Sequence, residues 1–315
     1  MRKIREVEIL RICRHPNIIP LVASDIVDTD LYIITRLATG GSLQDLLDDH
    51  ENGLNEDLVL HIFMQLVLGL QTGYFPEGNG KRLLSTVGSK QVDPFINGLV
   101  HLKLTLAQPE NILLCERNVY PRVMISDFGV SVFTDQIKDL LVVGTDAYKA
   151  PEIMKEEFDE TQYAKADCWA LGVILYQLLC GKYPFDELNV KEAIKNEEPT
   201  YEEPTWQHVS EKAKHVVQGL LQKNPYERLS TAQVCQTDWV SEYLIKSGFL
   251  EFLRKQWNEF MREEKVFRRI EVLERAKTLT RSVAEPQVRA PGRPFRRKLT
   301  KDEDKLIQRV SAQLR

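Results

Sequence analysis

The most constraining feature of this sequence is a short apolar run that ends in a carboxylate and a glycine. Residues 123–125, Val-Met-Ile, have the composition of a buried strand, and Ser126-Asp127-Phe128-Gly129 follows them directly. A carboxylate at a strand end, followed by a glycine that frees the turn, is what a magnesium-phosphate site requires. Three common residues also recur by chance, so this motif decides the fold only together with others.

Further motifs accompany it in a fixed order along the chain. Upstream, Pro109-Glu110-Asn111 leads into an apolar run, and the runs 111–114 and 122–125 are predicted to form two strands joined by a polar link. The Asn111 amide oxygen, on the neighbouring strand, can then reach the same metal as Asp127. Downstream lie Gly144-Thr145-Asp146-Ala147-Tyr148-Lys149-Ala150-Pro151-Glu152, Asp167-Cys168-Trp169-Ala170-Leu171-Gly172, and Arg228 in Asn-Pro-Tyr-Glu-Arg-Leu-Ser.

Taken together, these motifs resemble the eukaryotic protein kinases, from about residue 2 to residue 240. The Gly144-Thr145 pair indicates the serine/threonine class, and segments 15–21, 37–47 and 163–185 are most similar to calmodulin-dependent and checkpoint-type kinases. The resemblance implies an α+β, two-lobed kinase fold with an incomplete N-lobe sheet and a mostly helical C-lobe. It also implies transfer of the ATP γ-phosphoryl group to a protein serine or threonine.

The resemblance assigns roles to five residues of the C-lobe. Asp127 and Asn111 look like the two magnesium ligands that bridge the phosphates of ATP. Glu152 resembles the glutamate that forms a buried ion pair with Arg228 and fastens the substrate-binding loop. Asp167 resembles the aspartate on the central helix that holds the backbone of the catalytic loop.

Nucleotide and substrate contacts are implied in the same way. Glu6 takes the position of the regulatory-helix glutamate whose family role is to pair with a lysine, although a solvated helix glutamate is an equal alternative. Thr35 resembles the gatekeeper that precedes an adenine-binding hinge, and Ser42 lies near the ribose position. The implied contacts are Glu6, Thr35, Arg36, Leu37, Ala38 and Ser42 for the nucleotide, and Glu110 and Thr145 for the substrate loop.

The catalytic machinery is incomplete in this sequence. The family's glycine-rich loop and its strand lysine precede the regulatory helix and have no counterpart here. Counting back from Asn111 puts Leu104, Leu106 and Gln108 where the family's catalytic loop has His, Asp and Lys, so no proton acceptor is in register. His101 resembles the start of that loop and is either a remnant or a coincidence.

The predicted organisation has three parts. Residues 1–37 form a partial kinase N-lobe with the regulatory helix and two strands, residues 38–240 form the C-lobe, and residues 241–315 form a charged helical and basic tail. An irregular, glycine-containing insert at 71–108 interrupts the C-lobe, and we expect it to replace the catalytic loop through a splicing or gene-reading error. Helices are predicted at 2–14, 43–49, 57–70 and 242–280, and strands at 18–22 and 31–35.

Composition restricts the class of protein. Apolar residues make up 43% and charged residues 28% of the chain, which is typical of a globular protein, and a net charge of −4 argues against a nucleic-acid partner. Five scattered cysteines without a C-x-x-C pair, and the lack of a long apolar run, predict reduced thiols, no membrane partner and an intracellular location in cytoplasm, nucleus or both.

Two functions remain open on the sequence alone. One is a serine/threonine kinase that uses ATP and Mg²⁺ and acts on a protein substrate, with impaired activity in the chain as written. The alternative is a pseudokinase, a scaffold or regulator without phosphotransfer. The tail, 242–315, could bind a further partner through its helical or basic part.

Overall fold

The structure, a computed structural model, describes residues 2–27, 30–72, 100–101, 108–128, 132–133, 145–155, 163–186, 188–201 and 204–284. The chain divides into two compact units, which are described separately. The first unit comprises residues 1–20 and 36–257, and the second comprises residues 21–35 and 258–315.

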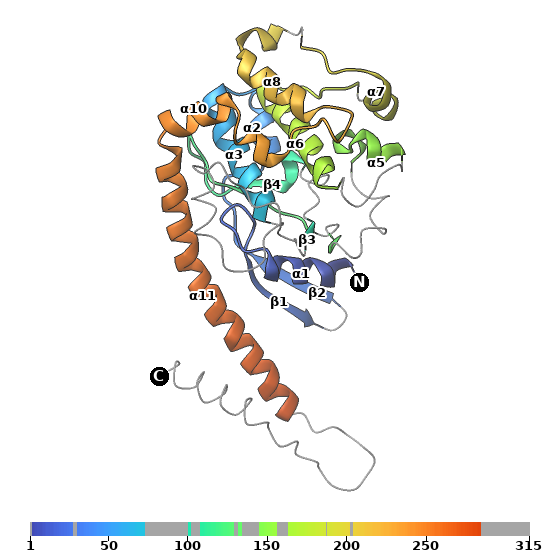
Figure 1. The fold of residues 1–315 in the computed structure, drawn as a ribbon. Helices are drawn as coiled ribbons and strands as arrows, with labels where there is room; N and C mark the ends of the chain where they lie inside the picture. Colours follow the sequence, from blue (N-terminus) through green and yellow to red (C-terminus); the bar gives the residue numbers. More distant parts are fainter. Residues whose placement is uncertain are drawn as a thin grey trace. The chain divides into compact units, whose positions relative to one another are not determined.

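The first unit is mostly helical and carries the small sheets of the predicted site (Figure 1). Two sheets in this unit have two strands each, β4 with β5 and β3 with β6. This mixture of short strands and many helices confirms the predicted α+β class. The helices are α1 (Arg2–Ile12), α2 (Leu43–Asp48), α3 (Glu56–Thr72), α5 (Pro151–Lys155), α6 (Tyr163–Cys180), α7 (Val190–Asn196), α8 (Glu211–Leu220), α9 (Thr231–Val234), α10 (Asp238–Lys246) and the start of α11 (Phe249–Ala284).

Helices α3 and α6 form the centre of the core. Their sequences are apolar on almost every side, and side chains from Val59 to Leu70 on α3 and from Ala166 to Cys180 on α6 are buried. Gly172 on α6 lets α8 approach closely, because a Cβ atom there would come within 2.9 Å of the Leu220 side chain. The predicted helix at 57–70 is therefore confirmed as a core element.

The hairpin of β4 (Ile112–Leu114) and β5 (Val123–Ile125) is antiparallel, with Ile112 opposite Ile125 and Leu114 opposite Val123. Residues 17–19 flank β5 on its other side: the Ile125 amide donates to Asn17 O (2.9 Å), and the Ile19 amide donates to Ile125 O (2.9 Å). The strand that leads to Asp127 is thus held on both edges.

The second unit contains the antiparallel hairpin of β1 (Leu21–Val27) and β2 (Asp30–Thr35). The strand predicted at 18–22 was therefore placed too early. Ile18 and Ile19 are buried beside β5, and the strand itself continues through the more polar residues Ser24 and Asp25. The prediction was wrong because Ile18 and Ile19 are apolar for another reason. They are buried against β5 and do not belong to the β1–β2 hairpin.

The C-terminal region forms two helices where one was predicted. Gly248 adopts a left-handed conformation, with a φ of 71°, between α10 and α11, and a glycine takes up this backbone conformation without steric cost.

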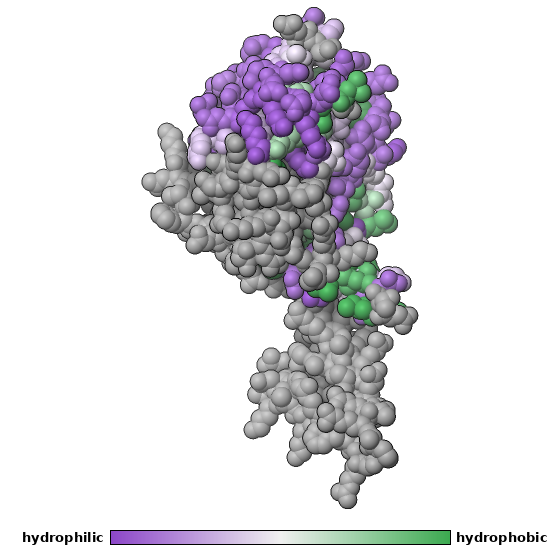
Figure 2. Space-filling model, turned by 90° about the vertical axis from the view of Figure 1, so that its right-hand side faces the viewer, coloured by the Kyte–Doolittle hydropathy of each residue, from purple (hydrophilic) through white to green (hydrophobic). Residues whose placement is uncertain are grey.

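On the face shown in Figure 2, the described helical part of the first unit has a mostly hydrophilic surface.

Most of the predicted insert at 71–108 lies outside the described residues, namely 73–99 and 102–107. Within it, β3 (Val100–His101) pairs antiparallel with β6 (Val132–Phe133), so that His101 is opposite Val132. At its end, Gln108 precedes the short 3₁₀ helix η2 (Pro109–Asn111).

Candidate active site

The β4–β5 hairpin brings the two predicted magnesium ligands together. Ser126 binds Asn111 O through both its amide (2.8 Å) and its hydroxyl (2.7 Å), which fixes the ends of the two strands against each other. Asn111 Nδ2 then lies 3.4 Å from Asp127 Oδ2, at hydrogen-bond distance. The two side chains are 16 residues apart in the sequence, and the hairpin brings them together at a position that faces solvent.

Asp127 has an unusual backbone conformation. Its φ is 59°, and it is the only described non-glycine residue with a positive φ. This region costs a non-glycine residue on the order of 1 kcal/mol or more, and such strain persists where the surrounding structure over-determines it, often at functional sites. Its neighbour Phe128 is buried, whereas Asp127 itself is exposed. This backbone conformation directs the Asp127 carboxylate to the surface, while the preceding strand β5 stays in the core.

The donor set at this position suits a hard divalent cation. Mg²⁺ prefers oxygen ligands and is commonly held by one or two protein groups, with waters and substrate phosphates completing its shell. Asp127 offers a carboxylate and Asn111 an amide oxygen, both reachable from solvent. In the described part of the chain, no cluster of three or more His, Cys, Asp or Glu side chains could enclose a metal. The carboxylate and amide oxygens fit a cation shared with a phosphate ligand.

The residue in register with the family's catalytic-loop lysine makes a specific contact. Gln108 Nε2 donates to the Thr145 hydroxyl, which joins the start of η2 to the segment before the short 3₁₀ helix η4 (Asp146–Tyr148). Leu104 and Leu106, in register with the family's His and Asp, lie outside the described residues. The substrate-loop candidates Glu110 and Thr145 are both exposed.

Charged and aromatic contacts support the segment after Thr145. Asp146 binds Lys149 (2.6 Å) and Lys191 on α7 (3.1 Å), and both lysines lower the pKa of this carboxyl, the hydrogen bond from Lys149 being the main cause. The Tyr148 hydroxyl donates to Gln177 Oε1 on α6 (2.9 Å), and burial raises the Tyr148 pKa. The substrate-loop segment is thus attached to both α6 and α7.

Glu152 and Arg228 form the predicted buried ion pair. Two parallel hydrogen bonds join the guanidinium to the carboxylate, at 2.7 and 2.9 Å. Arg228 is 1% exposed and Glu152 is 6% exposed. Arg228 also donates to the carbonyl oxygens of Gln222 and Lys165, and it lies 5.1 Å from the Trp169 ring centroid. This arrangement satisfies most of the guanidinium donors and forms a rigid anchor.

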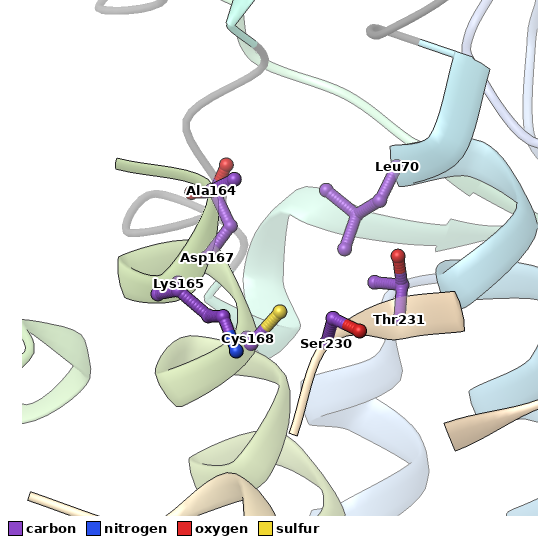
Figure 3. A pocket seen from close by; sticks show the side chains of 7 residues that line it. All are labelled: Leu70, Ala164, Lys165, Asp167, Cys168, Ser230 and Thr231. Atoms are coloured by element: carbon purple, nitrogen blue, oxygen red, sulfur yellow. The ribbon is translucent and has the colours of Figure 1, made fainter. Parts of the chain in front are cut away.

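Asp167 lies on α6 and is 3% exposed. It borders a small cavity of about 70 Å³, shown in Figure 3, into which side chains from α3, α6 and α9 project. The lining residues are Leu70, Ala164, Lys165, Asp167, Cys168, Ser230 and Thr231. The cavity is small and mainly apolar, so it offers no room for a nucleotide.

The hinge candidates form a connection with ordered backbone contacts. The Arg36 amide donates to Pro20 O, and the Thr39 amide donates to Cys115 O (3.2 Å each), whereas the Leu37 side chain is 79% exposed. Ser42 is the N-cap of α2: its hydroxyl accepts from the Asp45 amide, and its own amide donates to Asp45 Oδ2. The Ser42 hydroxyl thus has a structural partner at the position predicted for ribose binding.

Two nucleotide-site candidates are placed by their own elements. Glu6 is half-buried on α1, beside the buried residues Val7 and Ile9. Thr35 ends β2 in the second unit, opposite Leu21, and is half-buried.

A buried polar network behind β5 was missed by the sequence analysis. Gln65 on α3 is fully buried, and its Oε1 accepts from Asn17 Nδ2 (2.9 Å) and from the Val123 amide (3.0 Å). His61, one turn earlier, contacts Pro121 O through Nε2 (3.1 Å). The signal was available: His61 and Gln65 are four residues apart in an otherwise apolar helix, so they share one face.

Comparison with known proteins gives the family. A sequence profile described as "Protein kinase domain" matches residues 97–240, and one described as "Protein tyrosine and serine/threonine kinase" matches residues 1–73. Calcium/calmodulin-dependent protein kinase type I of Schizosaccharomyces pombe is 34% identical over 252 residues, which are 78% of this chain and 67% of the relative. The chain belongs to the serine/threonine protein kinases.

Other relatives are of the same class. CBL-interacting serine/threonine-protein kinase 7 of Arabidopsis thaliana is 30% identical over 79% of this chain, and human SNF-related serine/threonine-protein kinase is 33% identical over 75%. The chain covers 52% and 27% of these two relatives. The predicted transferase class is thus confirmed for this kinase domain. In the part of the chain that the structure describes, no helix is long and apolar enough to cross a membrane.

Proposed function

We propose that this kinase chain binds Mg·ATP through Asn111 and Asp127 and that its phosphotransfer to protein serine or threonine is strongly reduced. The observation that carries the proposal is the meeting of the Asn111 amide and the Asp127 carboxylate at the end of the β4–β5 hairpin. The positive φ of Asp127 supports it, because strain of this kind is kept where a side chain must point in one direction.

The two residues have distinct tasks in this proposal. The Asp127 carboxylate supplies the charged ligand, and the Asn111 amide turns its oxygen toward the same cation, which replaces the present contact between them. When bound, Mg²⁺ supplies neutralisation of phosphate charge. The bonds from Ser126 to Asn111 O keep the two side chains in place, so little rearrangement is needed on binding.

Nucleotide recognition is proposed for the connection after β2. The Arg36 amide already donates to Pro20 O, so adenine would use other backbone groups of Arg36, Leu37 and Ala38. Thr35 would border the base as a gatekeeper, and Ser42 would lie near the ribose. Glu6 on α1 completes the proposed set.

The expected loss of activity follows from the segment before Pro109. Between His101 and Pro109 the sequence contains no Asp or Glu that could accept the substrate proton. Loss of a general base typically lowers the rate by about 10²- to 10⁴-fold. Gln108 binds Thr145 in the register of the family lysine but is uncharged, so it offers no charge to the phosphate. The inclusion of His101 in the matched range 97–240 supports its interpretation as a remnant of the catalytic loop.

Substrate binding is proposed at the exposed residues Glu110 and Thr145, next to the segment that Asp146 and Tyr148 attach to α7 and α6. The substrate class is a protein serine or threonine, as for the family. An intracellular location, in the cytoplasm, the nucleus or both, is proposed from the scattered cysteines of the sequence, which include no C-x-x-C pair.

The test is Mg²⁺-dependent binding of ADP to the purified full chain, followed by radiolabelled phosphotransfer. Binding that needs Mg²⁺ and disappears in Asp127→Ala supports the proposal. The matched control is Glu116→Ala, which removes an exposed carboxylate from the turn of the same hairpin. Binding that survives Asp127→Ala, or is lost equally in the control, would contradict the proposed site.

A pseudokinase function is the second candidate, favoured by the lack of a carboxylate at 102–108. In this function the C-lobe surface and the tail at 242–315 bind a partner without phosphotransfer. Phosphotransfer that Asp127→Ala abolishes would exclude it.

A further inference from the structure

The first turns of α11 present one face to the first unit. Phe249, Leu253 and Gln256 are 2%, 7% and 4% exposed and follow the spacing of a single helix face. Lys255, on the opposite side, is exposed. We call Phe249, Phe252, Leu253, Gln256 and Trp257 the docked face. The start of α11 follows α10 directly in Figure 1.

Aromatic contacts join the docked face to α3. The His61 ring centroid lies 4.5 Å from that of Phe252 and 5.3 Å from that of Phe249, both with edge-to-face geometry. Tyr120, from the turn between β4 and β5, contacts the same imidazole at 5.2 Å. Burial lowers the His61 pKa to about 4, so the ring is neutral at physiological pH and packs as an aromatic group. The docked face thus meets both α3 and the turn that leads into β5.

Gln256 reaches the buried polar network. Its Nε2 donates to Gln65 Oε1 at 3.2 Å, the same oxygen that accepts from Asn17 and from the Val123 amide. Gln65 Nε2 in turn donates to Pro121 O at 3.0 Å. One buried amide therefore connects α11, α3, the loop after α1 and the first residue of β5.

Trp257 contacts that loop directly. Its ring lies 5.7 Å from the His15 ring in edge-to-face geometry, and His15 Nδ1 accepts from the Asn17 amide (3.0 Å). Arg122 adds two bonds to Pro16 O, at 2.9 and 3.1 Å. The loop is therefore fixed from two sides, by Trp257 and by the residue that precedes β5.

The contacts continue to the proposed metal site. Asn17 binds β5 twice, through its side chain to Val123 O (2.9 Å) and through its carbonyl from the Ile125 amide (2.9 Å). Asp127 follows Ile125 by two residues and holds its strained φ only while the preceding strand is fixed. The chain of contacts runs from the docked face through the loop 15–17 and β5 to the carboxylate.

We propose that the docked face of α11 is a positioning element of the active site, which holds β5 and thereby keeps Asp127 aligned with Asn111. Its consequence for binding rests on the proposed Mg·ATP site. Trp257 and Gln256 are positioning residues, because they act through His15 and Gln65. In this arrangement the docked face stabilises the site and does not block it, so loss of the docked face weakens the binding of Mg·ATP.

The test uses the full chain with Trp257→Ala and, as a milder change, Gln256→Leu. Losing an aromatic pair of this kind should weaken Mg·ADP binding by about two- to tenfold in Trp257→Ala. The Mg²⁺ concentration needed for half-maximal ADP binding should rise in the same variant, because the effect acts through Asp127. Lys255→Ala, on the exposed side of the same helix turn, is the matched control and should bind as the parent does.

A second measurement needs no nucleotide. Hydrogen exchange should become faster by about two- to tenfold at the amides of Val123, Ile125 and Ile19 in Trp257→Ala, with less change in α6 and α8. Val217→Ala, a fully buried position on α8, provides a destabilised control away from the network. Its exchange should rise in the helical core first.

The outcomes separate the two proposals. Faster exchange confined to 17–19 and 123–125, together with weaker Mg·ADP binding, supports the positioning role. Unchanged exchange at β5, a uniform rise equal to that in Val217→Ala, or tighter Mg·ADP binding in Trp257→Ala would overturn it. If the parent chain binds no Mg·ADP, the proposed function fails, and the exchange pattern still decides whether the docked face fixes β5.

Discussion

The anchor at Glu152 and Arg228 and the pair Asn111 and Asp127 both join residues distant in sequence, but they are built in opposite ways. The anchor is buried, has two bonds of 2.7 and 2.9 Å, and uses further carbonyl oxygens. The Asn111–Asp127 pair lies at the surface, its two side chains approach to 3.4 Å, and it includes a residue with a positive φ. In the first pair the two charges neutralise each other, whereas the carboxylate and amide oxygens of the second pair can serve as ligands of a cation.

The largest expected effect concerns the anchor. Arg228→Ala leaves the Glu152 carboxylate buried without its partner, so we expect the free energy of unfolding to fall by about 3–5 kcal/mol. Urea denaturation followed by circular dichroism measures it. The double variant Arg228→Leu with Glu152→Leu should recover much of the loss, because it leaves no unpaired charge. A loss below about 1 kcal/mol in Arg228→Ala, as for a surface pair, would break the comparison.

An effect that is smaller for each pH unit should appear in acid, at two buried histidines near β5. Burial lowers the pKa of His15 to about 3 and of His61 to about 4, with Arg122 adding to the shift at His15. The unfolded chain, with a histidine pKa of about 6.5, binds protons at these two residues that the folded chain does not bind. Stability is therefore full above about pH 6.5 and falls as the pH drops toward 4, by up to about 1.4 kcal/mol per pH unit for each histidine.

Urea denaturation at several pH values measures this slope. His61→Phe keeps an aromatic ring against Phe249 and Phe252 and should remove the contribution of His61 to the dependence of stability on pH. His50, which is exposed on the surface, gives the control in His50→Gln. An unchanged slope in His61→Phe would show that the docked face does not depend on a neutral imidazole.

The smallest expected effect is at Asp127 and has the opposite sign. Asp127→Gly removes the side chain that makes a φ of 59° unfavourable, so we expect a gain in stability of about 1 kcal/mol together with loss of Mg²⁺-dependent ADP binding. Asp127→Ala should lose binding without this gain, because alanine keeps the strain. Thermal unfolding and Mg²⁺ titration together decide it. A destabilised Asp127→Gly would mean that the carboxylate has a structural role like that of Glu152.

Sequence reasoning reached the parts of the fold that local pattern determines. The runs 111–114 and 122–125 form the predicted β4–β5 hairpin, the helix predicted at 43–49 is α2, and the helix predicted at 57–70 is α3. The Glu152–Arg228 pair followed from the ordered motifs of the family. In each case the residues that determine the structure are close in sequence or belong to a motif of fixed order.

The rest depended on contacts between distant residues. Asn17, Gln65 and Gln256 meet in one network although they are separated along the whole chain, and no local period predicts which buried amide binds which. The helix at 242–280 was predicted, but its contact with α3 was not. The roles of Glu6, Thr35 and the hinge residues stay predictions, because they depend on a bound nucleotide.

The docked face also sets a boundary for biochemical work. The matched kinase profile ends at residue 240, yet a recombinant fragment that stops there would lack Phe249 and Phe252 and would leave the rings of His61 and Tyr120 uncovered. Exposed apolar surface of this kind promotes aggregation on concentration. A fragment meant for crystallisation or inhibitor screening should therefore extend beyond Trp257.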